Sequence, residues 1–145
     1  MPNIKPGGDN MITKKSDIEI KSSKKEELID ITEKIRVFVK GTGIKTGLLT
    51  VFSHHTTGAI TVNDGSDGDV ARDILLGLSK AFPEDKSFMH MEGNSTAHIK
   101  SSTIGCSVTI IITNGYPDLG LWQSVLFCEF DGPRTRKILL YAMGE

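Results

Sequence analysis

Four histidines are the residues of this chain best suited to chemistry, and all of them fall in polar segments or at the ends of apolar runs. They are His54, His55, His90 and His98. Imidazole is the side chain that most often binds a metal ion or transfers a proton near neutral pH. The segment from His90 to His98 (HMEGNSTAH) places two of these rings and the carboxylate of Glu92 within nine residues. This spacing makes the segment a candidate metal or acid–base site.

A larger site follows if residues 95–103 form a short helix. His98 then lies one turn into the helix, and His90 lies on the loop that leads to it. Together with His55 and Asp64, these residues would make a site of three imidazoles and one acidic partner. A catalytic zinc centre has this composition, with three protein ligands and one position left for water or substrate. Histidines that only face solvent from loops would have the same spacing, so the local pattern leaves both interpretations open.

A second polar cluster lies at residues 129–134 (EFDGPR). Glu129 and Asp131 are two residues apart, so on an extended strand their side chains share one face. Arg134 follows a Gly-Pro turn and offers a planar fork for a phosphate or a carboxylate. The alternative is an internal arginine–carboxylate pair that closes the turn. Just upstream, Trp122 and Gln123 offer a stacking surface and an amide, although a single Trp in an apolar strand is typical of a core.

Composition limits the classes of protein to which the chain can belong. Its 145 residues include 17 Lys and Arg, 18 Asp and Glu, and 38% hydrophobic residues, which is ordinary for one soluble domain. A net charge of −1 argues against a general nucleic-acid binder. We find neither a run of about 18 apolar residues nor the apolar core of a signal peptide, so we expect a cytoplasmic protein without a membrane partner. Cys106 and Cys128 lack CxxC spacing and are expected to be buried, reduced thiols.

The residue patterns indicate one domain over residues 16–145, preceded by a flexible tail over residues 1–15. Residues 18–20 and 28–29 suggest a hairpin around a polar turn, and a helix follows from Asp30. A helix start at Ser23 would instead remove the second strand. A second helix is expected over residues 67–83, and strands are expected over 47–53, 57–63, 106–113, 119–130 and 135–142. The expected fold is α+β, with a mainly antiparallel sheet or sandwich and two or three helices.

Three ordered segments resemble the YjbQ family, also called uncharacterised protein family 0047. They are HHTTG at 54–58 with Asn63-Asp64, the segment 90–98, and FCEFDGPR at 127–134, and the resemblance runs from about residue 18 to residue 142. It implies a compact α+β fold and a homotrimer. For some family members it also implies a secondary thiamine-phosphate synthase activity.

The resemblance also implies roles for individual residues. His55, His90 and His98 would be metal ligands or site histidines, and Asp64, Glu129 and Arg134 would be polar members of the same pocket. The family pattern has Asn-Glu-Asn where this sequence has Asn63-Asp64-Gly65. The carboxylate is therefore kept on a shorter side chain.

Three functions from different classes follow. The first is a weak transferase that forms thiamine phosphate and expels diphosphate, whose charge a divalent metal ion (zinc or magnesium), Arg134 or Lys100 would neutralise. Thr56 and Gln123 would add contacts to this small phosphorylated substrate. The second is a metal-dependent hydrolase of a small phosphorylated or carbonyl substrate, in which Asp64 or Glu92 is the base. The third is a non-catalytic trimer that binds a metal or a ligand.

Overall fold

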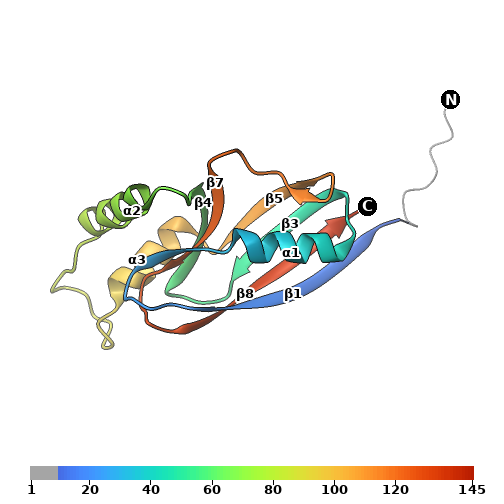
Figure 1. The fold of residues 1–145 in the computed structure, drawn as a ribbon. Helices are drawn as coiled ribbons and strands as arrows, with labels where there is room; N and C mark the ends of the chain where they lie inside the picture. Colours follow the sequence, from blue (N-terminus) through green and yellow to red (C-terminus); the bar gives the residue numbers. More distant parts are fainter. Residues whose placement is uncertain (1–9) are drawn as a thin grey trace, which may run out of the picture.

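Two antiparallel sheets and three helices make up residues 10–145, which are the residues that the computed structural model describes (Figure 1). The five-stranded sheet has the order β1 (Ile12–Lys21), β8 (Thr135–Gly144), β3 (Thr46–Ser53), β5 (Ser107–Thr113) and β6 (Tyr116–Pro117). The three-stranded sheet has the order β2 (Glu27–Asp30), β7 (Gln123–Glu129) and β4 (Gly58–Asp64). The helices are α1 (Thr32–Thr42), α2 (Gly68–Ala81) and α3 (Ser95–Ile104). This architecture confirms the expected α+β fold class.

The main core lies between the two sheets and is closed at one side by α1 (Figure 1). Alternate residues of β3, β5 and β8 point inward, as the period of two in a strand requires. They meet the inner face of β4 and β7 and the apolar stripe of α1, where Ile35 and Val39 are fully buried one turn apart. Asp30 lies just before this helix and accepts a hydrogen bond from the amide of its first residue, Thr32, at 2.9 Å. Gly43 ends the helix with a φ of +75°.

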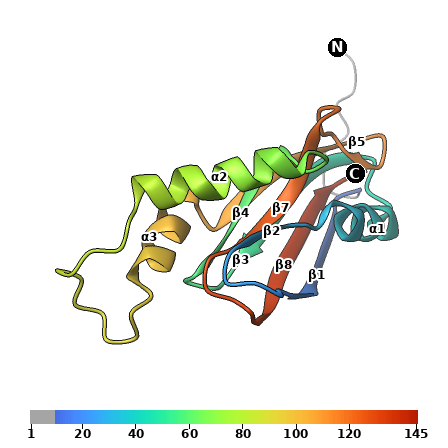
Figure 2. The same cartoon turned by 60° about the vertical axis from the view of Figure 1, so that its left-hand side comes forward.

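A smaller core on the opposite face of the three-stranded sheet holds α2 and α3. Ala97 of α3 packs with Ala59, Cys128 and Phe130, while Leu75 and Leu78 of α2 cover the same cluster. Both views show α2 and α3 together at one end of the molecule, with the loop that joins them projecting outward (Figures 1 and 2). Strand β7 therefore has protein on both faces, which explains why its last five residues are all buried.

One expectation about local pairing is wrong. The apolar residues at 18–20 and 28–29 do lie in strands, but β1 pairs with β8 and β2 pairs with β7, so the two do not form a hairpin. Local sequence favours a turn between them, whereas the register of each strand is set by a distant partner with a longer apolar face. Strand β1 also begins at Ile12, inside the segment expected to be a tail. The rest of that expected tail, residues 1–9, lies outside the described residues.

Trp122 is a second correction. It was expected in the core, but 67% of its surface is exposed, because β7 begins only at Gln123 and Trp122 belongs to the preceding loop. Within the described part of the chain, we find no helix that is both long enough and apolar enough to span a membrane.

Candidate functional site

Three histidines from separate segments gather at the end of the molecule where α3 meets β3 and β4. His55 lies between β3 and β4, His90 lies on the loop before α3, and His98 lies in α3 itself. Backbone hydrogen bonds join these segments, since the amide of Ile60 donates to the carbonyl of Gly105 and that of Ser53 donates to the carbonyl of Cys106. The C-terminal end of α3 is thereby fixed beside the loop that carries His55.

Two cavities meet at His98. One, of about 510 Å³, is lined by His55 and His98 together with Thr56, Gly58, Ser101, Ser102, Gly105 and Cys106. The other, of about 390 Å³, is lined by His98 and His90 together with Phe88, Met89, Ser95 and Ile99. The rings of His90 and His98 meet edge to face, with their centroids 5.2 Å apart. The structure thus places His55, His90 and His98 along one continuous surface.

The backbone of Lys137 on β8 fixes the ring of His55. The Lys137 amide lies 2.9 Å from His55 Nε2, and the Lys137 carbonyl oxygen lies 3.1 Å from the same nitrogen. If Nε2 carries the proton it donates to that carbonyl, which leaves the Nδ1 lone pair for a ligand. If Nδ1 carries the proton, Nε2 accepts from the amide and the ring offers an N–H donor instead. Either tautomer keeps the ring in the same position.

We expect His55 to titrate below the ordinary histidine pKa of 6.5. Burial lowers its pKa, and the charge of Arg136 and the neighbouring His54 lower it further. Because the unfolded chain binds this proton more tightly, His55 contributes stability that is present above about pH 6.5 and is lost as the pH falls through its native pKa. A titration of the ring protons by NMR measures this value. A native pKa at or above that of the unfolded chain would contradict the described environment.

Cys106 is an unforeseen member of the His55 cavity. It was expected to be buried, but it is exposed at the start of the turn into β5, whereas Cys128 is only 1% exposed in the core. Burial raises the pKa of the Cys128 thiol to about 12. We expect iodoacetamide to label the folded chain once, at Cys106, and the unfolded chain twice, as measured by intact mass. Labelling of Cys128 at a similar rate in the folded chain would contradict this packing.

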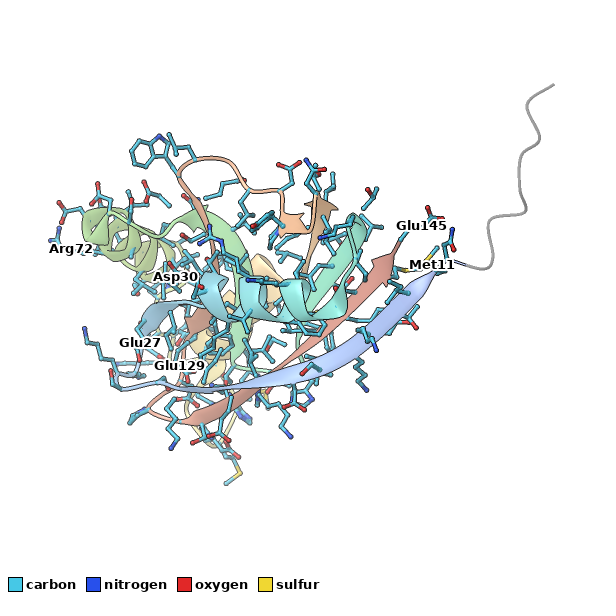
Figure 3. All side chains as sticks on the ribbon, turned by 45° about the vertical axis from the view of Figure 1, so that its right-hand side comes forward. Met11, Glu27, Asp30, Arg72, Glu129 and Glu145 are labelled. Carbon is cyan, nitrogen blue, oxygen red and sulfur yellow. The ribbon has the colours of Figure 1, made fainter. Side chains whose placement is uncertain are left out.

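Glu129 does not reach the histidine surface. It is fully buried in an ion pair with Arg136, whose guanidinium also donates to Thr57 Oγ1 at 2.8 Å. The hydroxyl of Ser22 donates to Glu129 at 2.6 Å. Burial raises the pKa of Glu129, but the hydrogen bonds from Arg136, Ser22 and the Asp131 amide outweigh it and hold the pKa below its usual value. Figure 3 shows Glu129 beside Glu27, its partner across the β2–β7 pair.

The turn after β7 closes on itself. Arg134 donates to the carboxylate of Asp131 at 2.8 Å and to the Asp131 carbonyl at 2.7 Å. The side chain of Asn94, at the start of α3, donates to the same carboxylate at 2.9 Å. Burial raises the pKa of Asp131, yet these bonds and the charge of Arg134 hold it below its usual value. The arginine–carboxylate pair that the sequence analysis offered as an alternative, Arg134 with Asp131, is therefore present. The hydrogen bond from Asn94 ties the turn to α3.

Lys100 is also engaged elsewhere. Although it lies on α3 two residues after His98, it is only 4% exposed and its ammonium contacts Glu26 at 2.8 Å and Ser79 at 3.0 Å. These bonds fasten α3 to α2 and to the loop before β2. A role for Lys100 in binding phosphate stays a prediction that would require this pair to open.

The structure does not bring Asp64 to the histidines. Asp64 ends β4, while Gly58 at the opposite end of that strand lines the His55 cavity, a separation of about 20 Å at the usual rise per residue. Its carboxylate accepts hydrogen bonds from the amide and hydroxyl of Ser66, which lower its pKa. Gln123 pairs with Asp64 across the sheet and accepts from the Gly120 amide at 2.8 Å. Both belong to the far end of the three-stranded sheet.

Thr56 and Glu92 remain near the histidines. Thr56 is exposed and lines the His55 cavity, and Glu92 is exposed on the loop two residues after His90. Neither cavity includes a carboxylate among its lining residues in the part of the chain that the structure describes. Of the acidic residues expected at the site, Glu92 is the one nearest in sequence to a histidine of this surface.

Comparison with known proteins identifies the family. The family described as "UPF0047 protein YjbQ-like" matches residues 16–145. The chain is 45% identical to the UPF0047 protein YugU of Bacillus subtilis over 128 residues, which cover 88% of this chain and 97% of that protein. It belongs to the YjbQ-like family. Among solved structures, a YjbQ/UPF0047 family protein of Clostridium acetobutylicum is 46% identical with a TM-score of 0.84, and the match covers 86% of this chain and 97% of that one.

A more distant YjbQ-like structure has the same fold. The protein of Sulfolobus solfataricus is 30% identical with a TM-score of 0.89, and the match covers 93% of this chain and 99% of that one. The two antiparallel sheets and three helices of this chain are therefore the fold of the YjbQ-like family.

The donor set of this YjbQ-like protein suits a metal ion in part. Two imidazoles on one tetrahedral zinc ion, each with N–Zn of about 2.0–2.1 Å, have centroids roughly 5 Å apart. The 5.2 Å between His90 and His98 agrees with this spacing. Over residues 10–145, no three His, Cys, Asp or Glu side chains are gathered closely enough to complete a metal site. The His90–His98 pair could thus hold an ion, with His55 the nearest further imidazole along the surface.

Proposed function

We propose that this YjbQ-like protein is a weak transferase of the thiamine-phosphate synthase type, with its site at the His55–His90–His98 surface. The observation that supports this most is the convergence of three imidazoles from separate segments on two cavities that share His98. Both cavities fall within the range of about 300–1,000 Å³ typical of small-ligand sites. A divalent metal ion held by His90 and His98 would supply positive charge to the oxygens of a diphosphate.

The chemistry of this transfer suits the residues at the surface. A thiazole ring nitrogen attacks the pyrimidine methylene with its lone pair and forms the C–N bond, while the C–O bond breaks and its electrons leave with diphosphate. The attacking nitrogen carries no proton, so the step needs no general base. Hydrolysis does need one, and the two carboxylates considered for that role are poorly placed: Asp64 lies at the far end of β4, and Glu92 is not among the residues lining either cavity. The absence of carboxylates from the described cavity linings also avoids repulsion of an anionic substrate.

The nearby cations explain why we assign the charge to imidazoles and a metal ion. Arg134, Arg136 and Lys100 each contact a carboxylate, namely Asp131, Glu129 and Glu26. Each of these pairs would have to break before its cation could bind diphosphate. A protonated or metal-bound imidazole needs no such rearrangement.

Two measurements test this proposal together. The gene should restore growth to a strain that lacks thiamine-phosphate synthase, and elemental analysis should find a divalent metal in the purified protein. The His55/His90/His98 triple alanine variant should lose both, whereas His54→Ala should keep both, because His54 is exposed and outside the cavity linings. Equal metal content in the wild type and the triple variant would overturn the ligand assignment. Metal-stimulated release of phosphate from a phosphoester panel without growth rescue would favour the hydrolase instead.

We also propose that the chain assembles as a homotrimer. The outer face of the five-stranded sheet carries an apolar row in which Leu48 is paired with both Ile111 and Met143, and all three are more than 40% exposed. Exposed apolar patches of this kind usually mark a protein interface. Light scattering should give a mass of three 15.8 kDa chains. A mass of one or two chains would contradict the trimer.

A further inference from the structure

We propose that copies of this chain contact one another end to end, so that Trp122 of one copy forms part of the wall of a cavity in the next. The cavity is the one of about 390 Å³ that His90 lines, here called the His90 cavity. The contact joins the Leu121–Trp122 turn, just before β7, to the Met89–Met91 loop, which precedes α3. It rests on the proposed function for the number of copies and for the role of the His90 cavity.

The Leu121–Trp122 turn presents two large apolar side chains to solvent. Two hydrogen bonds close it, because the Gly120 amide donates to the side chain of Gln123 at 2.8 Å and the Gln123 amide donates to the Gly120 carbonyl at 3.0 Å. Leu121 is 89% exposed and Trp122 is 67% exposed. The centre of a turn is usually taken by Gly, Pro, Asn, Asp or Ser. A fixed turn that carries Leu and Trp there has apolar surface for a partner to cover.

A second turn, at the histidine end of the molecule, has the same character. The Gly93 amide donates to the carbonyl of His90 at 3.1 Å, which places Met91 at the centre of the turn with 99% of its surface exposed. Met89 is 93% exposed and also lines the His90 cavity. Among the large apolar side chains that the structure describes, these two methionines and the two residues of the Leu121–Trp122 turn have the largest exposed fractions. A partner that covers Met89 therefore becomes part of the cavity wall.

One chain cannot bring these two apolar surfaces together. Gln123, next to Trp122, pairs with Asp64, which ends β4 just before α2, whereas the Met89–Met91 loop follows the end of α2. The 14 residues of α2 separate the two by about 20 Å. Figure 2 shows the start of β7 beside one end of α2 and the loop to α3 beyond its other end. A contact between unlike ends of two copies is heterologous, and three such contacts close into the ring of a homotrimer.

The area of these surfaces is close to what a stable contact needs. Large side chains bury roughly 150 Å² each, so the four at one contact would bury about 600 Å² of apolar surface. The smallest stable interfaces bury about 1,200 Å² in total, of which about 700 Å² is apolar. In a ring, each copy makes the contact once with each of its ends, and neither apolar surface stays in water. A second copy is therefore the partner that accounts for both surfaces at once.

Cross-linking of the full-length chain tests the contact. A Cys106→Ser background leaves only the buried Cys128. In it, the variant Met89→Cys/Leu121→Cys should be joined by a short bis-maleimide into covalent trimers on a denaturing gel. The matched control Met89→Cys/Val37→Cys should remain as single chains, because Val37 is 65% exposed on α1, outside the contact. No trimers from the first variant, or equal yields from both, would overturn the contact.

Trp122 is the only tryptophan of the chain, so its fluorescence reports its burial directly. In the assembled protein the emission should be that of a buried indole. It should move to longer wavelength in Met89→Asp, which places a charge against the indole, and should stay unchanged in the control Val37→Asp. The emission of a fully exposed indole that neither variant changes would overturn the contact.

The ring signals of His90 in NMR spectra test whether Trp122 reaches the cavity wall. Trp122→Ala should shift these signals and should weaken assembly about 30-fold, as for a central aromatic residue of an interface. Tyr116→Ala should do neither, although it also removes an aromatic side chain that is 65% exposed, on β6. Unchanged His90 signals in Trp122→Ala would overturn the place of Trp122 in the cavity wall.

These measurements need neither a bound metal nor growth rescue, so they separate the contact from the proposed function. Covalent trimers and a buried Trp122 in a protein that rescues no growth would support the contact and reject the transferase. Growth rescue by a protein with an exposed Trp122 and no cross-linking would support the transferase and overturn the contact. A trimer by light scattering that does not cross-link would leave the sheet face as its interface and would likewise overturn the end-to-end contact.

Discussion

Replacing Arg136 by Met is expected to lower the free energy of unfolding by about 3–5 kcal/mol, the largest stability effect that the structure predicts. Arg136 is 4% exposed, and its guanidinium binds Glu129, which is fully buried. Its removal leaves a carboxylate without its counter-ion in the interior, where an unpaired charge is costly. The loss can be measured by chemical unfolding at neutral pH, where the wild-type carboxylate is ionised.

Arg134 provides the matched control for this variant. It is also an arginine paired with a carboxylate, only two residues away, but its side chain is 51% exposed. Arg134→Met should therefore cost no more than about 1 kcal/mol, as is usual for exposed pairs. The double variant Glu129→Met/Arg136→Met should recover part of the loss, because it removes the orphaned charge. Equal losses for Arg134→Met and Arg136→Met would contradict the buried pair.

Replacing His98 by Ala is expected to have the largest effect on the proposed activity. His98 is the residue that lines both cavities, and its ring contacts that of His90. A change in a partner that only orients a metal ligand costs about 10–100-fold in affinity, so loss of a ligand should weaken zinc binding by about 100-fold or more. Isothermal titration with zinc measures this effect. Growth rescue should be lost in the same variant.

His54→Ala is the control that shows whether the loss of zinc affinity is specific to His98 or follows from removing any histidine. His54 stacks edge-on against His55 with centroids 4.9 Å apart, yet it is exposed and lines neither cavity. Zinc affinity should change less than threefold in this variant. If His54→Ala and His98→Ala weakened zinc binding alike, the metal would be bound by exposed rings without a defined site.

Residues that carry local signals were predicted well from the sequence. The helix over Gly68–Ala81 begins where Asp67 accepts a hydrogen bond from the Asp69 amide, and that capping pattern is legible in the chain. The hairpin expected before Asp30 failed because strand partners are chosen by long-range burial, which no local pattern records. The strands of the second half carried enough β-branched and apolar residues to be recognised.

The candidate site was predictable for the histidines and not for their surroundings. His90 and His98 are close in sequence. His55 lies beside them because a backbone hydrogen bond from Ile60 of β4 to Gly105 holds the end of α3 next to the loop that carries His55. Arg136 was overlooked, although it alternates with Ile138 and Leu140 on the inward face of β8, a position where an arginine signals a buried partner. Asp64 was misplaced although the strand expected over residues 57–63 already sets it at the opposite end from His55. Glu129 was misplaced because spacing along the chain does not reveal which face of a strand is buried.

A zinc titration of the full-length chain, followed by the ring signals of the four histidines in NMR spectra, tests most directly whether the His90–His98 pair holds a metal ion. We expect the signals of His90 and His98 to change together and to be complete at one equivalent of zinc per chain. Those of His54 should stay in place. No change at His90 and His98, separate stoichiometries for these two rings, or an equal change at His54 would contradict this site.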